Sequence, residues 1–213
     1  VVKVLYEFDG KVFAGGQFSE AGGKPAQGIA FWNGSEWIGL TEGPAFGNNS
    51  NNSITDMIEF RGNLVVSGNS GKIGDKAFNC IAEWTGTESH SFGEGIKGNY
   101  PIINSMSILN GELIVGGYFS TAGDSAVESV ATWNGSDWKS GPVSVIGTVY
   151  DLEAYGDSLW VGGSFYKVNG KICNNVALAV KDSVSNLNGG FGSQYSSEVF
   201  KFFKYKNRVC AAG

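Results

Sequence analysis

Short apolar runs alternate with polar turns along the whole chain, and one run returns at a regular interval. Close copies of this run occupy residues 11–18 (KVFAGGQF), 112–119 (ELIVGGYF) and 158–165 (SLWVGGSF), and weaker copies occupy 63–70 (NLVVSGNS) and 208–213 (RVCAAG). The second glycine of each copy is Gly16, Gly68, Gly117, Gly163 or Gly213, so the interval is 46–52 residues. A period of this length is the signature of a repeat protein.

Each repeat predicts four β-strands. An apolar run precedes the Gly-Gly run, and a third run follows it in the copies GIAFWNGSEW (28–37), CIAEWTGTES (80–89) and SVATWNGSDW (129–138), whereas NVALAVKDSV (175–184) lacks the tryptophan. The first turn contains Asp9-Gly10, Arg61-Gly62, Asn110-Gly111 or Gly156-Asp157, and the second contains Asn33-Gly34, Thr85-Gly86 or Asn134-Gly135. Asn-Gly and Asp-Gly between apolar runs predict tight hairpin turns of type I′. Each repeat is therefore expected to be an antiparallel sheet.

A single four-stranded sheet cannot bury both of its faces, so neighbouring repeats must pack against it. Four-stranded units of this length packed radially form a β-propeller. We therefore predict an all-β chain with one propeller region over residues 1–213, with blades at 1–52, 53–101, 102–148 and 149–197 and a partial blade at 198–213. We expect the doubled glycine to allow a close strand approach or a bulge. The residues expected to fill the space between blades are Phe18, Phe119, Phe165, Trp32, Trp84 and Trp133.

Composition removes several classes of protein. The chain is 42% hydrophobic and 16% charged, which is typical of a folded domain and not of a disordered one. Its net charge is −5 and its basic residues are scattered, so no basic stripe indicates nucleic-acid binding. The apolar runs are far shorter than the roughly 20 residues of a membrane-spanning helix. Cys80, Cys173 and Cys210 have no metal-ligand spacing and leave the redox compartment open.

The repeated pattern, which reads V-x-x-L…G-x-L-x-V-G-G-x-F-x-x-A-G…A-x-W-N-G-x-x-W, resembles the kelch-like propeller repeats of large extracellular proteins. Similar arrays occur in fungal cortical marker proteins and in bacterial surface proteins. The resemblance covers essentially the whole chain and implies a propeller at the cell surface. Two repeats depart from the pattern: the second has Ser67-Gly68-Asn69 in place of Gly-Gly-x-Phe, and the fourth lacks the Trp-Asn-Gly hairpin.

Few residues suggest catalysis. The chain has one histidine, His90, so a multi-histidine metal site is excluded, and we predict neither a metal nor a cofactor. Asp56 and Asp151 share one position of the first strand, where the other repeats have Val4, Ser105 and Lys201. If this strand lines a central channel, two carboxylates and a lysine converge there as a cation site or a general acid/base pair. The alternative is that these residues are solvated or neutralise one another.

Two further groups of residues are candidates for binding or modification. Trp37 and Trp138 occupy the outer fourth strand, where exposed tryptophans would favour a carbohydrate site. Four Asn-x-Ser sequons occur, at Asn33, Asn48, Asn51 and Asn134. Asn33 and Asn134 already have a role in the turns, so glycosylation is expected first at Asn48 or Asn51. The loops between second and third strands (19–26, 72–78, 121–127 and 167–173) should open on one face, and their similarity to one another suggests a structural turn.

These features favour a non-catalytic extracellular or cell-surface scaffold or adhesion module, which could form one section of a fibrous array. Its expected partners are proteins or glycans, with no nucleic acid partner. A carbohydrate-binding propeller is the alternative, and a hydrolase or lyase with Asp56 and Asp151 in its channel is a third hypothesis. The fifth repeat contains only two strands, so its second strand has an open edge beside Val209 and Cys210. Completion of this edge within a longer parent chain, or by a second copy docking head to tail, is expected.

Overall fold

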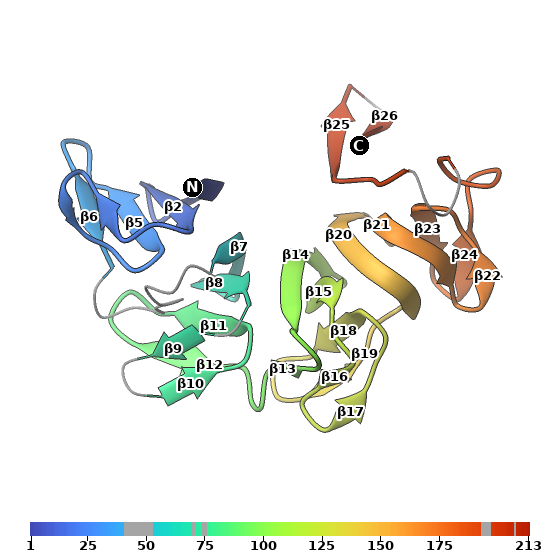
Figure 1. The fold of residues 1–213 in the computed structure, drawn as a ribbon, viewed down its shortest axis with the longest axis horizontal. Helices are drawn as coiled ribbons and strands as arrows, with labels where there is room; N and C mark the ends of the chain where they lie inside the picture. Colours follow the sequence, from blue (N-terminus) through green and yellow to red (C-terminus); the bar gives the residue numbers. More distant parts are fainter. Residues whose placement is uncertain (41–52, 70, 74–75, 193–196, 207) are drawn as a thin grey trace. The chain divides into compact units, whose positions relative to one another are not determined.

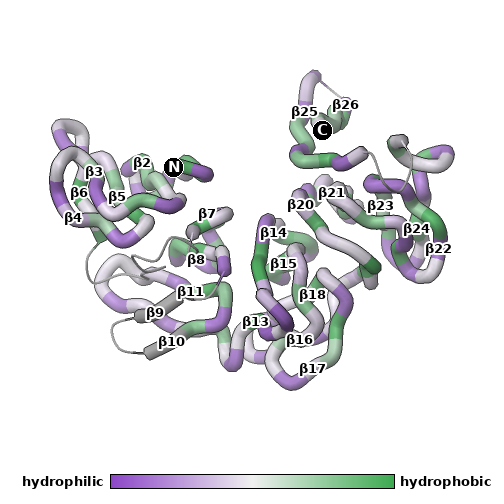
Figure 2. Tube along the Cα trace, in the orientation of Figure 1, coloured by the Kyte–Doolittle hydropathy of each residue, from purple (hydrophilic) through white to green (hydrophobic). Residues whose placement is uncertain are grey.

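The computed structural model describes residues 1–40, 53–69, 71–73, 76–192, 197–206 and 208–213 (Figure 1). Within these residues every regular element is a β-strand. Apolar residues concentrate on the strands, and the connecting turns are largely hydrophilic (Figure 2). The all-β class predicted from the sequence is therefore confirmed. The chain divides into two compact units, Val1–Ile103 and Asn104–Gly213, and each is described by itself.

The first unit contains the first two repeats, and each repeat forms one four-stranded sheet. Neighbouring strands along the chain also neighbour each other in the sheet, apart from the short hairpins β3–β4 and β9–β10. The strands of the unit are β1 (Val2–Phe8), β2 (Lys11–Gly16), β3 (Glu20–Ala21), β4 (Lys24–Pro25), β5 (Ile29–Trp32), β6 (Trp37–Gly39), β7 (Ile54–Phe60), β8 (Asn63–Gly68), β9 (Gly71–Ile73), β10 (Lys76–Phe78), β11 (Ile81–Trp84), β12 (Ser89–Ser91) and β13 (Ile96–Lys97).

The second unit contains the third and fourth repeats, each with its own four-strand path, followed by a two-stranded hairpin from the fifth. Its strands are β14 (Ile102–Leu109, which begins at the boundary of the units), β15 (Glu112–Tyr118), β16 (Thr121–Ala122), β17 (Ser125–Ala126), β18 (Val130–Trp133), β19 (Trp138–Ser140), β20 (Val145–Tyr155), β21 (Ser158–Val168), β22 (Lys171–Ile172), β23 (Val176–Val180), β24 (Ser183–Ser185), β25 (Lys201–Tyr205) and β26 (Arg208–Ala212). The predicted antiparallel sheets are confirmed, and their arrangement as blades of one propeller stays a prediction.

The first turn has the predicted geometry in the first three repeats. Asp9 and Gly10 both have positive φ (50° and 67°), as do Asn110 and Gly111 (53° and 79°). Two consecutive positive φ angles define the type I′ turn, whose twist matches that of the flanking strands. Arg61-Gly62 fits as well (54° and 82°), whereas at Gly156-Asp157 only the glycine has positive φ (57°), so the type I′ turn is not confirmed in the fourth repeat.

The second turn differs from the prediction. Trp32 pairs directly with Trp37, so the loop between β5 and β6 has four residues and is not a two-residue type I′ turn. The side chain of Asn33 stabilises the longer loop, because its Oδ1 accepts hydrogen bonds from the backbone N–H groups of Ser35 and Glu36 (both 2.9 Å). Asn134 repeats this arrangement in the third repeat. Asparagine thus acts here as a side-chain cap and not through its tolerance of positive φ.

The two positions of the Gly-Gly run exclude a side chain for different structural reasons. A Cβ on Gly116 would lie 2.7 Å from side-chain carbons of Val149 and Leu152 in the next repeat. A Cβ on Gly163 would lie 2.1 Å from the carbonyl oxygen of Thr148, in the first strand of its own repeat. The first glycine therefore admits side chains of the next repeat, and the second admits the adjacent strand. Both fit the expected close approach of strands.

Met57, Leu152 and Phe202 insert over the first glycine of the preceding repeat. We call their position in the first strand, which Leu5 and Met106 occupy in the other repeats, the knob position. The face of each sheet that carries the knob is called the knob face, and the opposite face, which carries the first glycine, is called the socket face. Within the first unit, Phe13 and Ile29 of the first socket face pack with Met57 and Leu64 of the second knob face. Consecutive repeats within a unit are thus joined by an apolar core between a socket face and a knob face.

The predicted inter-repeat aromatics are buried in most repeats. Phe119 and Phe165 are buried, as are Trp84 and Trp133. Phe18 is half-buried and Trp32 is 37% exposed, so for these two residues the predicted role between repeats stays a prediction. Trp32 lies on the knob face of the first repeat, because it pairs with Val12, which in turn pairs with Glu7 on that face.

Candidate functional site

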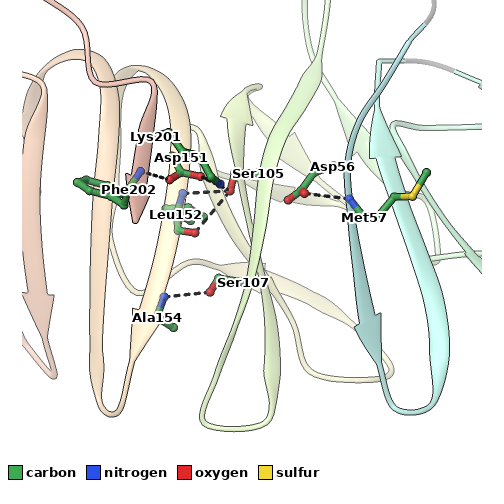
Figure 3. A network of polar contacts seen from close by, with 9 residues as sticks. All are labelled: Asp56, Met57, Ser105, Ser107, Asp151, Leu152, Ala154, Lys201 and Phe202. Carbon is green, nitrogen blue, oxygen red and sulfur yellow. Dashed lines mark hydrogen bonds and ion pairs between the residues drawn. The ribbon is translucent and has the colours of Figure 1, made fainter. Parts of the chain in front are cut away.

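A ladder of side-chain hydrogen bonds joins the first strands of successive repeats. In the second unit, Oγ of Ser105 accepts a bond from the N–H of Leu152 (3.1 Å), and Oγ of Ser107 accepts one from the N–H of Ala154 (3.0 Å; Figure 3). In the first unit, Oη of Tyr6 accepts a bond from the N–H of Glu59 in the next repeat (2.9 Å). These first strands belong to different sheets. Side chains therefore supply the acceptors that a backbone ladder would otherwise provide.

A β-bulge in the first strand directs some of these hydrogen-bonding side chains toward the next repeat. The pairing register shifts between Val2 and Val4, between Ile54 and Asp56, and between Val149 and Asp151. The extra residue in the second repeat is Thr55, whose Oγ1 donates a hydrogen bond to the carbonyl oxygen of Ile103. The extra residue in the fourth repeat is Tyr150, whose hydroxyl lies 3.4 Å from a carboxylate oxygen of Glu198. Bulges are known to re-aim side chains in this way.

Asp151 has the most polar partners within this ladder. Its carboxylate is only 1% exposed, and its Oδ1 accepts bonds from Oγ of Ser105 (3.1 Å) and from Nζ of Lys201 (2.6 Å; Figure 3). Its Oδ2 accepts a bond from the N–H of Phe202 (2.6 Å). These contacts occupy three of the roughly four lone-pair directions of a carboxylate. Asp151 thus joins the third, fourth and fifth repeats through one side chain.

Two further titratable groups follow Asp151 on β20, because every second side chain of a strand lies on the same face. Burial raises the pKa of Glu153, and the negative charge of Asp151 raises it further, whereas Lys201 opposes the increase. The pKa of Tyr155 is also raised, first by burial and then by the charges of Glu153 and Asp151. The ammonium group of Lys204 lies 5.6 Å from the centre of the Tyr155 ring. The socket face of the fourth repeat therefore carries Asp151, Glu153 and Tyr155, and Lys201 and Lys204 of the fifth repeat lie against them.

The chemistry open to this cluster is limited by its hydrogen bonds. A general base needs a lone pair that can reach a substrate proton. The Asp151 carboxylate is buried and is bonded to a hydroxyl, an ammonium group and a backbone N–H. Glu153 is the better acid/base group because its pKa is raised and it is only partly buried. The cluster is nevertheless organised mainly as an electrostatic and hydrogen-bonded connection between repeats.

The residues that share the position of Asp56 and Asp151 in the first strand do not all come together. The structure brings Ser105, Asp151 and Lys201 together from three successive first strands. Asp56 lies in the first unit, where its Oδ1 accepts a bond from the N–H of Met57 (2.9 Å), and Val4 packs against the apolar core of that unit. The sequence analysis singled out Asp151 but not Glu153. Glu153 lies two residues after Asp151 on β20, and side chains two residues apart on a strand lie on the same face. This alternation was the signal that could have identified Glu153.

The candidate carbohydrate-binding tryptophans lie on fourth strands, as predicted, but differ in exposure. Trp138 is buried, and its ring centre lies 5.3 Å from that of Trp133. Its ring is therefore not displayed for stacking on a sugar. Trp37 is half-buried and forms an edge-on pair with Trp32, at 5.7 Å between ring centres. Sequence reasoning missed Trp32 as part of this pair because it was expected to be an inter-repeat core residue.

Two of the four sequon asparagines have the role in turns that the sequence suggested. Oδ1 of Asn33 and Oδ1 of Asn134 each accept backbone hydrogen bonds from the residues two and three positions later. Asn48 and Asn51 lie outside the described residues. His90, the single histidine, is half-exposed and lies 3.6 Å from a carboxylate oxygen of Glu88.

The connections between second and third strands form short hairpins, which fits the expectation of a structural turn. Examples are β3–β4 in the first repeat and β16–β17 in the third. Beside β17 lies an open cleft of about 700 Å³, lined by Ser120, Glu128, Pro142, Ser144 and Asn169 among others. Its polar groups are engaged with one another: Ser144 Oγ bonds to the Glu128 carboxylate, and Ser144 N–H donates to Oδ1 of Asn169.

A search of the described part of the chain finds no group of three or more His, Cys, Asp or Glu side chains placed to hold a metal ion. In the same residues there is no helix long and apolar enough to cross a membrane. All three cysteines are free thiols, and burial raises the pKa of Cys80 to about 12. An unreactive, protonated Cys80 thiol follows at neutral pH.

Comparison with known proteins gives a structural relationship only. No protein-family model and no curated protein sequence matches the chain. The fold is similar to that of a crystal structure from B. thetaiotaomicron, described as the extracellular domain of a hybrid two-component system, with a TM-score of 0.59 and 13% sequence identity. The match covers 99% of this chain and 25% of that one. The chain therefore spans about a quarter of its structural neighbour, and the likeness concerns the fold.

Proposed function

We propose that the chain is a set of β-propeller blades of kelch-like type that serves as a non-catalytic scaffold or adhesion module outside the cell or on its surface. The propeller arrangement is supported by sheets that each follow the chain from first to fourth strand. It is also supported by the contacts between first strands of successive repeats within each unit. In a propeller these strands would surround the central axis.

The observation that carries the non-catalytic assignment is the use of Asp151. The buried Asp151 carboxylate of the fourth repeat is bonded to Ser105 of the third repeat and to Lys201 and Phe202 of the fifth. A side chain that holds repeats together in this way contributes to stability and not to turnover. Hydrolase or lyase activity through Asp56 and Asp151 is correspondingly the least supported hypothesis.

The location is proposed from two considerations. The structural neighbour is described as an extracellular domain, and the repeat pattern resembles that of surface proteins. The sequons at Asn48 and Asn51 are compatible with a secretory route. Partners of such a module would be proteins or glycans at the cell surface.

Surface labelling of intact cells that produce the full protein tests the location. An antibody against the chain should label unpermeabilised cells, or detect the protein in the medium, and permeabilisation should add little signal. Labelling that requires permeabilisation would contradict the proposal. In parallel, the purified chain and its Glu153→Gln variant should both be inactive in a screen of glycoside hydrolase and lyase substrates, and any turnover lost in the variant would indicate an enzyme.

Carbohydrate binding is the second candidate, and the Trp32–Trp37 pair is the observation that favours it. Aromatic rings that are partly exposed offer an apolar face and a polar N–H to a ligand. A glycan array probed with the chain and with its Trp37→Ala variant tests this role. Binding that disappears in Trp37→Ala but persists in a variant of the buried Trp138 would establish it. If no glycan on the array binds the chain, carbohydrate binding is contradicted and the scaffold assignment stands.

A further inference from the structure

An asparagine side chain makes the same contact in the second and fourth repeats. Nδ2 of Asn79 donates a hydrogen bond to the carbonyl oxygen of Glu94 (2.7 Å), and Nδ2 of Asn174 donates one to the carbonyl oxygen of Gly189 (2.9 Å). In both repeats the two bonded residues are 15 positions apart. The asparagine thus ties the segment before the third strand to the segment that follows the fourth strand.

The third repeat has the same backbone contact but a different side chain at this position. In all three repeats the carbonyl oxygen of the position accepts a hydrogen bond from the N–H group 17 residues later: Asn79 from Ile96 (3.0 Å), Glu128 from Val145 (3.0 Å) and Asn174 from Phe191 (2.9 Å). Glu128 therefore stands where the second and fourth repeats have asparagine. The residue 15 positions after Glu128, which corresponds to Glu94 and Gly189, is Val143.

Glutamate cannot replace asparagine in this contact. The amide Nδ2 of asparagine donates, whereas an ionised carboxylate only accepts, and the peptide carbonyl of Val143 also only accepts. The Glu128 carboxylate instead accepts a hydrogen bond from Oγ of Ser144. Among the described residues it forms no ion pair. The third repeat therefore has an exposed carboxylate without a cation at the position where its neighbours have a donor.

This carboxylate lines the open cleft of about 700 Å³ beside β17. Val127, Val130 and Val143 also line the cleft, and the described lining residues include no lysine, arginine or second carboxylate. The wall at Ser144 is fixed, because its N–H donates to Oδ1 of Asn169 (2.8 Å) and its carbonyl oxygen accepts from the N–H of Asn169 (2.9 Å). The cleft thus combines one negative charge with an apolar surface and a braced wall.

We propose that this cleft binds the guanidinium group of an arginine side chain on a protein partner. A guanidinium group carries five N–H donors in a planar fork and forms paired hydrogen bonds with a carboxylate. It would neutralise Glu128, and its remaining N–H groups would donate to the carbonyl oxygen of Val143. The methylene stem of the arginine would pack on Val127 and Val130.

A divalent metal ion fits the cleft less well. Ca²⁺ takes 6–8 oxygen ligands, commonly with several carboxylates among them, and the described lining of this cleft has one carboxylate. The inference names a recognition site for the proposed adhesion function and rests on that function only in assigning the arginine to a protein.

Nuclear magnetic resonance titration of the full chain tests the site. The probe is the blocked peptide acetyl-Gly-Arg-Gly-amide, and the same peptide with citrulline in place of arginine is the uncharged control. The arginine peptide should shift the amide resonances of Ser129, Ser144 and Val145 in a saturable way. The dissociation constant should be on the order of 1 mM, because one side chain supplies only part of a protein interface. The citrulline peptide should leave these resonances unchanged.

Two substitutions separate the charge from the fold. Glu128→Gln removes the charge and should weaken binding of the arginine peptide at least about tenfold. Glu128→Asn introduces the side chain of the second and fourth repeats, so it should abolish binding and raise the melting temperature by about 2–4 °C, as expected for one added hydrogen bond. Asp182→Asn, at an exposed turn of the same unit, is the matched control for loss of one negative charge and should bind as the unmodified chain does.

Three outcomes would overturn the proposal. The arginine peptide could give no saturable shift, or Glu128→Gln could bind it as well as the unmodified chain does. Calcium chloride could also shift the same amides while the arginine peptide does not, which would assign the cleft to a metal ion. Labelling of intact cells reports on the location separately, so a failure of the arginine site leaves the proposed surface location untouched, and the reverse also holds.

Discussion

Nζ of Lys201 lies 2.6 Å from Oδ1 of Asp151, and the lysine side chain is 64% exposed whereas the aspartate is 1% exposed. The ion pair therefore has one solvated and one buried partner. A buried carboxylate is costly unless it is paired and hydrogen-bonded. Ser105 and the N–H of Phe202 supply the remaining hydrogen bonds. Asp151 can consequently stabilise the contact between repeats in spite of its burial.

Replacement of this carboxylate should therefore destabilise the second unit. Asp151→Asn keeps the size of the side chain but removes the charge that Lys201 and the N–H of Phe202 bind. We expect a loss of about 1.5–3 kcal/mol in unfolding free energy, as for hydrogen bonds to charged groups. Urea unfolding followed by tryptophan fluorescence measures it, because Trp160 packs edge-on against Phe202 at 5.9 Å. Asp182→Asn, at an exposed turn, is the control and should change stability little.

Stability should also depend on pH through Glu153. Its pKa is raised above the ordinary 4.5 in the folded chain, so the folded state holds this proton more tightly than the unfolded state. The stabilisation that the protonated group gives is complete below the ordinary pKa and is lost as pH rises through the raised pKa. Glu153→Gln should thus match the unmodified chain at low pH and exceed its stability at neutral pH, by on the order of a few tenths of a kcal/mol. Equal stability at both pH values would contradict this.

The local elements of the fold were predictable because their causes are local. The dipeptide Asp9-Gly10 and the run around Gly116 carry the turn and the close approach within a few residues. The loop at Asn33 was predicted wrongly because its length depends on what the side-chain oxygen binds, and the dipeptide does not reveal that. The use of Asn33 as a cap becomes visible only in its hydrogen bonds to Ser35 and Glu36.

The ladder between repeats was not predictable to the same extent. The shared position of Ser105, Asp151 and Lys201 was visible in the alignment of repeats, but their bonds join strands that are about fifty residues apart in sequence. Whether such residues meet depends on how the sheets stack, which no single repeat encodes. The β-bulge before Asp151 is equally invisible, because it inserts one residue without a glycine to mark it.

Glycosylation should distinguish the two kinds of sequon. If the protein passes through a eukaryotic secretory pathway, Asn48 or Asn51 should carry glycan, and Asn33 and Asn134 should be modified much less often. The amide oxygens of Asn33 and Asn134 are bonded to the backbone of their own turns, which hinders access to the transferase. Glycopeptide mass spectrometry measures occupancy at each site. Full occupancy at Asn33 with bare Asn48 and Asn51 would contradict this expectation.

Gly116 should not tolerate a larger residue, because Leu152 and Val149 of the next repeat pack directly against it. Gly116→Ala places a Cβ 2.7 Å from Cδ1 of Leu152 and Cγ1 of Val149, and overpacking of this kind costs about 1–3 kcal/mol. A double-mutant cycle with Leu152→Ala tests the mechanism. Leu152→Ala alone should cost about 2–5 kcal/mol, and the double variant should lose less than the sum, since the new methyl enters the space that Leu152 vacates. Strict additivity would show that the two residues do not share a socket.

Ser67 at this same position allows the opposite prediction. Its hydroxyl is buried, and it has no hydrogen-bond partner among the described residues. A buried hydroxyl without a partner costs free energy, so Ser67→Ala should raise the unfolding free energy of the first unit by about 1 kcal/mol.

Ser105→Ala is the matched comparison for Ser67→Ala, because the Ser105 hydroxyl is equally buried but bonded to Asp151 and to the N–H of Leu152. Its removal leaves a buried donor unpaired and should cost about 1–3 kcal/mol. The two serine-to-alanine changes remove the same atom, so opposite signs in their urea midpoints would show that partners, and not burial, decide the effect. A loss of stability in both variants would mean that Ser67 has a role that its buried hydroxyl does not reveal.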